Sequence, residues 1–250
     1  LHDISERFEV KFDLTAREKV RRADFIGRDL VIVLGGDGTL TSISHNIDAK
    51  TPVIGVNSHP MEQDPAGSFG FYMDSSVQTF AEDIVTALNG QAIINEIPRL
   101  QAIIDSTSGN RFTTDPAMND LLIANTHQYA PSKYHLRRNG KQCRQQSSGI
   151  VFSTWLGQGA WLNHILEKET IQKLRQKVQE SETGSHYFVV AREISHQQRD
   201  EEPWSWYDWT DESTIITSDM HRGYVVPDGW DEVHFNRGAS ITVNLDAPKL

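Results

Sequence analysis

Cysteine and long hydrophobic runs are the scarcest features of this 250-residue sequence. The one cysteine, Cys143, excludes a disulfide within the chain and is typical of a protein from a reducing compartment. The apolar runs fall far short of the roughly 20 residues that cross a bilayer, and no secretory signal is evident. We therefore expect no membrane partner and a cytoplasmic protein, or one of the mitochondrial matrix if the source is eukaryotic.

A basic surface is also missing. The chain has 34 acidic residues against 24 lysines and arginines, a net charge of −10, which disfavours a nucleic-acid partner because such proteins usually carry a basic face. The ten histidines show no HExxH or similar spacing, so no metal site is expected, and no GxxxxGK[ST] phosphate loop is present. The chain opens at Leu1 rather than at a methionine, which leaves open a segment ahead of it.

The most informative stretch runs from Leu30 to Leu40 and reads LVIVLGGDGTL. Its five leading apolar residues predict a buried strand, the glycines predict a sharp turn, and a helix should follow. A strand that passes through glycines into a helix is a phosphate-binding geometry, since backbone N–H groups and the helix N-terminus attract anions. Asp37 would repel phosphates unless it takes a proton or holds a metal. The alternative is a glycine turn with Asp37 as a helix N-cap.

The first part of the chain is predicted to be a parallel α/β unit. Strands over 30–34 and 52–56 alternate with helices over 39–47 and 75–88, and this order is typical of a parallel sheet. We expect Ser75 and Ser76 to cap the second helix and Asn89–Gly90 to end it. An exposed helix is also expected over 14–26.

After Gly90 the pattern becomes that of a β-rich domain. Asn139–Gly140 is typical of a hairpin turn, and 158–179 predicts one or two helices. We therefore expect one domain over 1–94 and a second over 95–250, with a return of the last strands to the first domain as an open alternative. The expected strands are 92–97, 100–105, 111–114, 119–125, 133–138, 186–191, 214–217, 223–226, 232–235 and 241–245.

Two stretches of this second part have the composition of ligand-binding loops. Asn119–Asp120 opens an apolar strand with an amide and a carboxylate, which suits hydrogen bonds to a ribose diol, although a plain turn is the alternative. Ser147–Trp161, SSGIVFSTWLGQGAW, predicts a strand, a small polar turn and a helix. It offers hydroxyl and N–H groups to a ligand or serves only as a packing turn.

The motifs GGDGT, GVN, GSFGFY, an Asn–acid pair and SSGIVFST…G…AW occur in this order, and together they resemble the NAD kinase family. The resemblance covers roughly residues 24–166, with a weaker echo in VVPDGWDEVHFNRG at 225–238. GGDGT alone is shared with diacylglycerol kinases and is near the GGDGS of phosphofructokinases, so the specificity lies in the ordered combination. The KYHLRRNGKQ segment and the closing AW look most like the mitochondrial-type branch and its bacterial relatives.

The resemblance implies a Rossmann-like α/β domain with the GGDGT loop and a C-terminal β-sandwich domain that carries much of an NAD site. It implies transfer of the ATP γ-phosphoryl group to the adenosine-ribose 2′-hydroxyl of NAD, with Mg²⁺, by at least a homodimer. Asp37 is then the expected catalytic base. The expected nucleotide-binding positions are Gly36, Gly38 and Thr39 for phosphates, Asn57, Phe71 for adenine, Asn119 and Asp120 for ribose, Ser148, and Thr154, Ala160 and Trp161 in the NAD pocket.

One turn departs from the family pattern. Where relatives have small hydroxyl residues, this chain reads STWLGQGAW, with bulky Trp155 and Leu156 and with Gly159 at another hydroxyl or lysine position. Ser148 stands where an aspartate is often found, although the mitochondrial-type branch also has serine there. At about 1 kcal/mol for each lost hydrogen bond, the departures would cost several kcal/mol of binding.

Two other functions stay open on the sequence. One is a non-catalytic dinucleotide-binding protein on this fold, against which Asp37 argues, since a pure binder gains nothing from an acid among phosphates. The other is a lipid or sugar kinase that shares GGDGT, against which the Asn–acid pair and the SSG…AW segment argue.

The Trp-rich insertion at 199–212, RDEEPWSWYDWTDE, is expected to be a lid, a dimer contact or a loop that packs its own aromatic residues. A set of basic residues alternates along the predicted hairpin and beyond it. Most are expected on a solvated face, with one or two reaching ATP phosphates: Lys133, Arg137, Arg138, Lys141, Arg144, Arg222 and Arg237.

Overall fold

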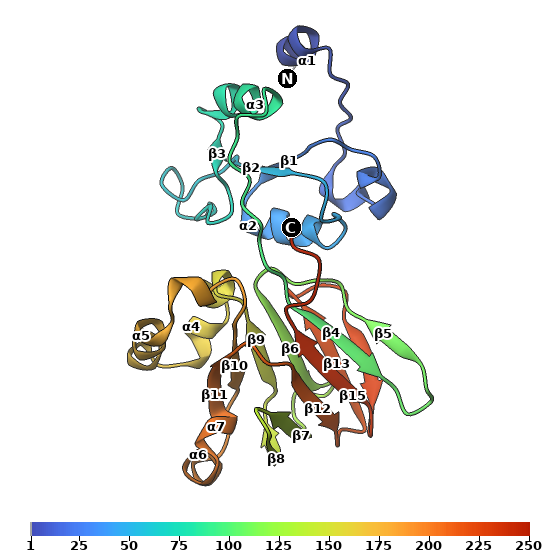
Figure 1. Cartoon of the computed structure of the whole chain (residues 1–250), viewed down its shortest axis with the longest axis vertical. Coiled ribbons are helices and arrows are strands. Elements are labelled where there is room, and N and C mark those ends of the chain that lie inside the picture. The colour runs from blue at the N-terminus through green and yellow to red at the C-terminus, as the bar shows by residue number, and fades with distance from the viewer. Residues whose placement is uncertain (1) are drawn as a thin grey trace. The chain divides into compact units, whose positions relative to one another are not determined.

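The computed structural model describes residues 2–250 and divides them into two compact units (Figure 1). The first unit extends to Glu96, and the second is Ile97–Lys249. No helix within the described residues has the length and apolar composition that a bilayer crossing requires.

The first unit is built on a parallel sheet of three strands in the order β1-β2-β3. Val31 of β1 pairs with Val53 of β2, and Val56 of β2 pairs with Ser75 of β3. Buried residues from the strands and helices, such as Val33, Leu40 and Ile84, form its core. Its strands are β1 (Val31–Gly35), β2 (Val53–Asn57) and β3 (Ser75–Ser76), and its helices are α1 (His2–Phe8), η1 (Arg17–Lys19), η2 (Arg22–Phe25), α2 (Asp37–Ser44) and α3 (Phe80–Leu88).

Two helices expected in this unit differ from those observed. The helix expected over 14–26 is wrong: the segment forms only the short 3₁₀ turns η1 and η2, because Phe25 is its one buried side chain and there is no apolar face to hold a longer helix. The helix expected over 75–88 begins only at Phe80. Ser75 and Ser76 instead form β3, and the Ser76 hydroxyl bonds to Thr79, the residue before the helix.

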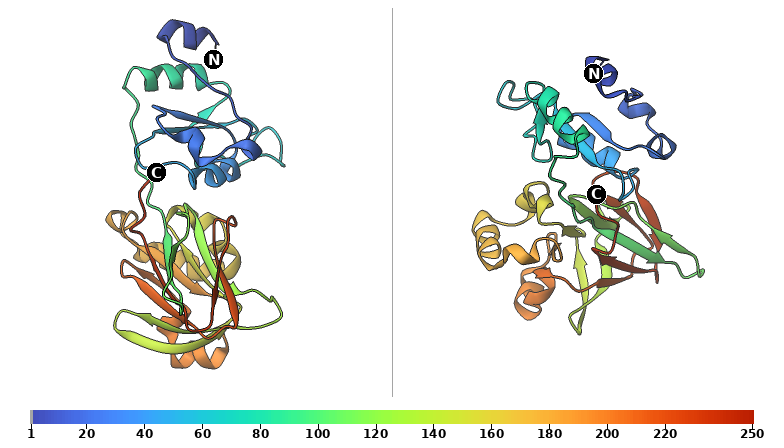
Figure 2. Two further views of the ribbon diagram at one scale, coloured as in Figure 1. Left: turned by 90° about the vertical axis from the view of Figure 1, so that its right-hand side faces the viewer. Right: turned by 45° about the horizontal axis from the view of Figure 1, so that its top comes forward.

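The second unit consists of two six-stranded sheets, which lie face to face in the turned views of Figure 2. One sheet has the order β11-β10-β9-β6-β13-β14 and the other β5-β4-β15-β12-β7-β8. Their strands are β4 (Gln101–Asp105), β5 (Arg111–Thr113), β6 (Asp120–Asn125), β7 (Ser132–Arg138), β8 (Lys141–Ser147), β9 (Ile150–Ser153), β10 (Tyr187–Ala191), β11 (Tyr207–Thr210), β12 (Thr214–Ser218), β13 (Arg222–Pro227), β14 (Val233–Asn236) and β15 (Ser240–Asn244).

The two sheets share one hydrophobic core. Leu121 and Phe152 contribute to it from one sheet, and Ile104, Leu136 and Ile241 contribute from the other, all almost fully buried. Side chains that alternate between core and solvent explain the strand patterns recognised in the sequence. The last strands, β13 to β15, pair within these sheets rather than with the sheet of the first unit.

The strand expected over 92–97 is wrong. These residues have no regular structure, and Ile93 and Ile94 are 88% and 70% exposed. An apolar run becomes a strand only when a neighbouring strand satisfies its backbone groups, and this run lies at the boundary between the units.

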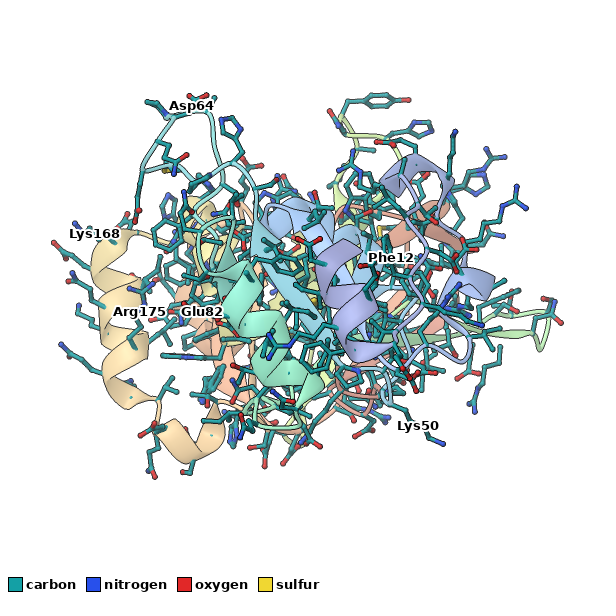
Figure 3. The ribbon with its side chains drawn as sticks, turned by 90° about the horizontal axis from the view of Figure 1, so that it is seen from above. Phe12, Lys50, Asp64, Glu82, Lys168 and Arg175 are labelled. Carbon is teal, nitrogen blue, oxygen red and sulfur yellow. The ribbon has the colours of Figure 1, made fainter. Side chains whose placement is uncertain are left out.

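Helical segments interrupt the second unit between β9 and β11. They are η3 (Leu156–Gly159), α4 (Leu162–Ile165), α5 (Lys168–Lys177), η4 (Glu180–Glu182), α6 (His196–Glu201) and α7 (Pro203–Trp206). α5 buries Ile171 and Leu174 and keeps Lys168 and Arg175 exposed (Figure 3). A small core of Leu162, Phe188 and their neighbours lies beneath these helices, and Trp155, Trp206 and Trp209 pack against it.

Candidate functional site

Asp37 is tied to the loop that follows β2. Its Oδ1 accepts the backbone N–H of Tyr72 at 2.8 Å, and its Oδ2 accepts the Ser68 hydroxyl at 3.0 Å and the Gly70 N–H at 2.9 Å. The Asp37 N–H in turn donates to Ser68 Oγ at 3.0 Å. The carboxylate therefore joins GGDGT to GSFGFY, with Asp37 and Ser68 lying 31 positions apart in the sequence.

Glycines permit this close approach. A Cβ on Gly36 would lie 2.4 Å from the Ser68 Cβ, and a Cβ on Gly70, which has φ +74°, would lie 2.5 Å from Asn57 Nδ2. Asn57 is buried, donates to the Ser68 carbonyl at 3.2 Å and accepts the His59 N–H at 3.3 Å. Asn57 thus supports the loop through its hydrogen bonds. The sequence did not distinguish this supporting position from contact with a ligand.

The remaining predicted residues of the first unit surround the start of α2. Gly36 is the residue before the helix, and Gly38 is exposed, with open space around it. Phe71 is 53% exposed and meets the Tyr72 ring edge-on at 5.2 Å, so its face is available to a ligand. A carboxylate has about four lone-pair sites, and three are used at Asp37, which leaves room for one more donor.

In the second unit, Asp228 holds the Asn119–Asp120 pair in place. Its Oδ2 accepts the Met118 N–H at 2.8 Å, and its Oδ1 accepts the N–H groups of Asn119 and Asp120 at 2.8 and 3.0 Å. The Asp228 N–H donates to the Asp120 carbonyl at 2.9 Å. Asp228 follows β13 with φ 47°, a left-handed conformation that aspartate tolerates. Its carboxylate therefore fixes the backbone on which the pair stands.

The Asp120 side chain is unusual because it is a buried acid beside another acid. It is 7% exposed and lies at the start of β6. Burial, and then the negative charge of Asp228, raise the pKa of the Asp120 carboxyl to about 7, while a hydrogen bond from the Trp161 backbone lowers it. Asp120 therefore exchanges its proton near neutral pH, unlike an ordinary surface aspartate.

Thr154 is hydrogen-bonded to the same backbone segment, Met118 and Asn119. Its hydroxyl donates to the Met118 carbonyl at 2.6 Å and accepts the Gly157 N–H at 2.9 Å, and its backbone N–H donates to the Asn119 carbonyl at 2.9 Å. A Cβ on Gly157 would lie 2.1 Å from that Asn119 carbonyl oxygen. The unusual STWLGQGAW turn is thus fitted to Asn119 by its glycine.

Trp161 and Ala160 complete the group, and Ser148 does not belong to it. Trp161 packs on the cluster that contains Leu122, with the Arg192 guanidinium 5.2 Å from its ring centre, and Ala160 is exposed. Ser148 lies beyond the opposite end of β9 from Thr154, where its hydroxyl donates to the Glu193 carboxylate. The structure therefore separates Ser148 from Asn119, Asp120, Thr154, Ala160 and Trp161.

The basic hairpin is less solvated than its sequence suggested. Arg138 is buried, donates to the Trp204 carbonyl at 2.6 Å and lies 3.2 Å from the Asp208 carboxylate. Burial lowers the pKa of this guanidinium, and the Asp208 charge opposes that effect. Arg144 pairs with Asp219 at 2.9 Å. Alternation along a strand places one set of side chains inward, and Arg138 belongs to that set.

Sequence reasoning missed Ser68 and Asp228. Ser68 lies within the recognised GSFGFY motif, and Asp228 lies within the weak echo at 225–238, so both were near a signal. Their function is to hold other residues, and that is visible only from the hydrogen bonds.

Comparison with known proteins shows which proteins this chain is similar to. Residues 4–92 match the family model of the ATP-NAD kinase N-terminal domain. An NAD kinase of Legionella pneumophila is 32% identical over 166 residues, which cover 64% of this chain and 50% of that protein. Over the matched residues, the chain is therefore similar to NAD kinases. A probable NADH kinase of rice is 28% identical over 150 residues, covering 53% of this chain and 44% of that protein.

The NAD kinase fold is supported by solved structures as well. Yeast NADH kinase in complex with NADH aligns over 92% of this chain and 61% of its own, with a TM-score of 0.68 and 16% identity. The NAD kinase of Archaeoglobus fulgidus in complex with ATP aligns over 99% and 85%, with a TM-score of 0.67 and 16% identity. The expected combination of an α/β domain and a β-sandwich domain is confirmed. The chain spans about half the length of the curated NAD kinases that it matches.

Proposed function

We propose that the protein transfers the γ-phosphoryl group of ATP to the adenosine-ribose 2′-hydroxyl of NAD, giving NADP and ADP. The observation that carries this proposal is the Asp37 carboxylate, fixed by three hydrogen bonds at the start of α2 in a chain similar to NAD kinases. Relatives that are 32% and 34% identical to this chain are named NAD kinase.

In the proposed reaction, Asp37 takes the proton of the 2′-hydroxyl through its remaining lone pair. The 2′-oxygen forms a bond to the γ-phosphorus as the bond from that phosphorus to the β,γ-bridging oxygen breaks, and ADP leaves. The phosphate oxygens bind beside Gly36, Gly38 and Thr39 at the start of α2, since the start of a helix favours anions. The exposed ring of Phe71 is available to stack on adenine.

The residues of the second unit are proposed to bind the dinucleotide. Asn119 and Asp120 contact ribose hydroxyls, with their backbone fixed by Asp228. Thr154 acts indirectly, because both of its hydrogen-bonding groups are used within the protein. Ala160 and Trp161 line the pocket. Ser148 fits this proposal only in a homodimer, where it would serve the pocket of the neighbouring subunit.

ATP is the proposed phosphoryl donor, used with Mg²⁺. Protein sites for Mg²⁺ commonly use one or two carboxylates together with substrate phosphates. Asp37 can give such a metal little, because three donors already occupy its oxygens. The phosphates of ATP would therefore supply most of the ligands, and the metal would neutralise their charge.

The proposed assembly is a homodimer or larger homo-oligomer in a reducing compartment such as the cytoplasm, or the mitochondrial matrix in a eukaryote. Its support is the family resemblance and the single, half-buried cysteine. The tryptophans of the insertion are half-buried: Trp206 and Trp209 pack against the small core of Leu162 and Phe188, and Trp204 packs against the core between the two sheets. Any partner subunit would therefore contact their remaining surface.

A non-catalytic dinucleotide-binding protein is the second candidate. Asp37 holds the loop at Gly70 and Tyr72 through hydrogen bonds, and a protein that only binds dinucleotides would also need that loop in place. The presence of Asp37 alone therefore does not decide between the two functions. A coupled assay of NADP formation from NAD and ATP separates them. Thermal shifts with NAD, NADP, ATP, diacylglycerol and sugar phosphates identify the ligand, and a shift with NAD but no NADP formed would favour the binder.

A further inference from the structure

The second unit contains a cavity of about 650 Å³ that none of the predicted site residues lines. It lies among α5, α6, α7 and β11, where the chain carries its Trp-rich insertion. This volume is within the range of about 300–1,000 Å³ that small-molecule sites occupy. The cavity therefore has the size of a binding site in its own right.

Arg199 of α6 is the polar group in the cavity that is best suited to bind a ligand. Its guanidinium lies over the Trp206 ring, 4.2 Å from the ring centre, where a cation is attracted to the face of the indole. Its Nε is buried and finds no hydrogen-bond acceptor among residues 2–250. A buried charged donor without an acceptor is unfavourable, so this N–H is suited to an oxyanion from outside the chain.

The carboxylates near Arg199 are largely committed elsewhere. Asp208 pairs with the buried Arg138 at 3.2 Å, and Glu182 accepts the Trp209 indole N–H at 3.0 Å. A neutral indole N–H does not cancel the charge of Glu182, so the lining charges that remain are Arg199 and Lys177, which are positive, and Glu182 and Asp200, which are negative. These charges sum to zero, so an oxyanion would be attracted locally by Arg199 and Lys177 and not by a net positive charge of the cavity.

Aromatic side chains supply the rest of the lining. Trp206, Tyr207 and Trp209 reach the cavity together with His186, whose ring is stacked with Trp209 at 5.6 Å. Trp206 and Tyr207 meet edge-on at 4.8 Å, so the wall offers rings in more than one orientation. Aromatic walls bind planar rings by stacking, and arginine binds phosphate through its planar set of donors.

We propose that this cavity is a second small-molecule site that binds a planar aromatic ring joined to a phosphate, as in a nucleoside monophosphate. Arg199 holds the phosphate, Lys177 adds charge, and Trp206 with its aromatic neighbours holds the ring. The site lies within the second unit and does not depend on the NAD kinase activity proposed above.

Isothermal titration with AMP tests the proposal on the full chain. We expect wild-type protein to bind AMP, and to bind adenosine and ribose 5-phosphate at least about tenfold more weakly, since each lacks one half of the recognised ligand. Arg199→Gln should weaken AMP binding at least about tenfold, because a charged donor to the phosphate is lost. Trp206→Leu should weaken AMP and adenosine alike but leave ribose 5-phosphate unchanged.

Arg192→Gln is the matched control, because Arg192 also lies over a tryptophan, Trp161, but does not line the cavity. It should bind AMP as wild-type protein does. The proposal is overturned if wild-type protein does not bind AMP, or if AMP binds Arg199→Gln and wild-type protein equally. Weakening by Arg192→Gln but not by Arg199→Gln would place AMP in the Trp161 region instead. NADP formation is measured separately, so failure of the proposed activity would not imitate any of these results.

Discussion

The backbone N–H of Tyr72 donates to the Asp37 carboxylate at 2.8 Å. The most chemically suggestive side chain of the GGDGT motif is therefore also the support of a neighbouring loop. With Ser68 and Gly70 as further donors, Asp37 couples the order of the GGDGT turn to the order of GSFGFY. Any substitution of Asp37 must be interpreted for chemistry and for loop structure together.

The Asp37→Asn variant is expected to lose NADP formation by about 10²–10⁴-fold, the usual contribution of a positioned general base. The amide group of asparagine would also face at least one backbone donor, which should lower the unfolding free energy by about 1–3 kcal/mol. Steady-state NADP formation and urea denaturation measure the two effects. Turnover near that of wild-type protein would remove Asp37 from the chemistry.

Ser68→Ala is the control for the structural part of that effect. It removes one donor to Asp37 and leaves the carboxylate and the two backbone donors in place. We expect a stability loss of about 1 kcal/mol and a fall in turnover of less than about tenfold. If Ser68→Ala were as inactive as Asp37→Asn, loop order rather than proton transfer would explain both variants.

Asn119→Ala is expected to weaken NAD binding by about 1–3 kcal/mol, because ribose hydroxyls would lose an amide partner. The backbone at position 119 stays held by Asp228 and Thr154, so the fold should persist. Titration calorimetry with NAD gives the dissociation constant, and circular dichroism monitors the fold. An unchanged dissociation constant would place the ribose elsewhere.

Asp120 should make stability depend on pH. Its folded-state pKa of about 7 lies above the ordinary aspartate value of 3.8, so between these values the folded chain holds a proton that the unfolded chain has lost. The contribution is fully present below about pH 4 and is lost as the pH rises through about 7. Urea denaturation at pH 5 and pH 8 should therefore show a fall in unfolding free energy that Asp120→Asn abolishes.

Asp228→Asn tests how the charge of Asp228 affects the pKa of Asp120. Removal of its negative charge should move the pKa of Asp120 downward, so the pH-dependent fall should end at lower pH and be smaller. The variant also offers an amide in place of one acceptor oxygen to the N–H groups of Met118, Asn119 and Asp120, and should be less stable overall. An unchanged pH profile in Asp228→Asn would mean that burial alone sets the proton affinity of Asp120.

Assembly is tested by light scattering at micromolar concentration. We expect a mass of at least twice the 28.3 kDa of the chain, and a 28.3 kDa monomer that still makes NADP would remove the dimer from the mechanism. Trp155→Ala and Trp204→Ala can then be compared. Trp155 stacks on Phe188 within the unit, so its loss should lower stability, whereas a loss of mass only in Trp204→Ala would place the interface at the insertion.

The sequence by itself determined the resemblance to NAD kinases, the α/β start and the β-rich second half. Local patterns suffice for these features, because the apolar run before Gly35 and the alternation in β7 are set by near neighbours. The ordered motifs also brought Asn119, Asp120, Thr154 and Trp161 into one list before any contact was known. Periodicity failed over 14–26 and 92–97, where most of the apolar residues, such as Leu14, Ile26 and Ile93, are exposed.

Only the tertiary structure decided what holds the site. Asp228 reaches the Met118 N–H across 110 positions, and Asp37 reaches Tyr72 across 35, separations at which no sequence pattern predicts a hydrogen bond. The burial of Arg138, the separation of Ser148 from Thr154 and the cavity beside Arg199 likewise follow from how the strands pair and the helices cover them. Such features depend on long-range packing, which fixes the direction and solvation of a side chain, and these in turn fix its chemistry.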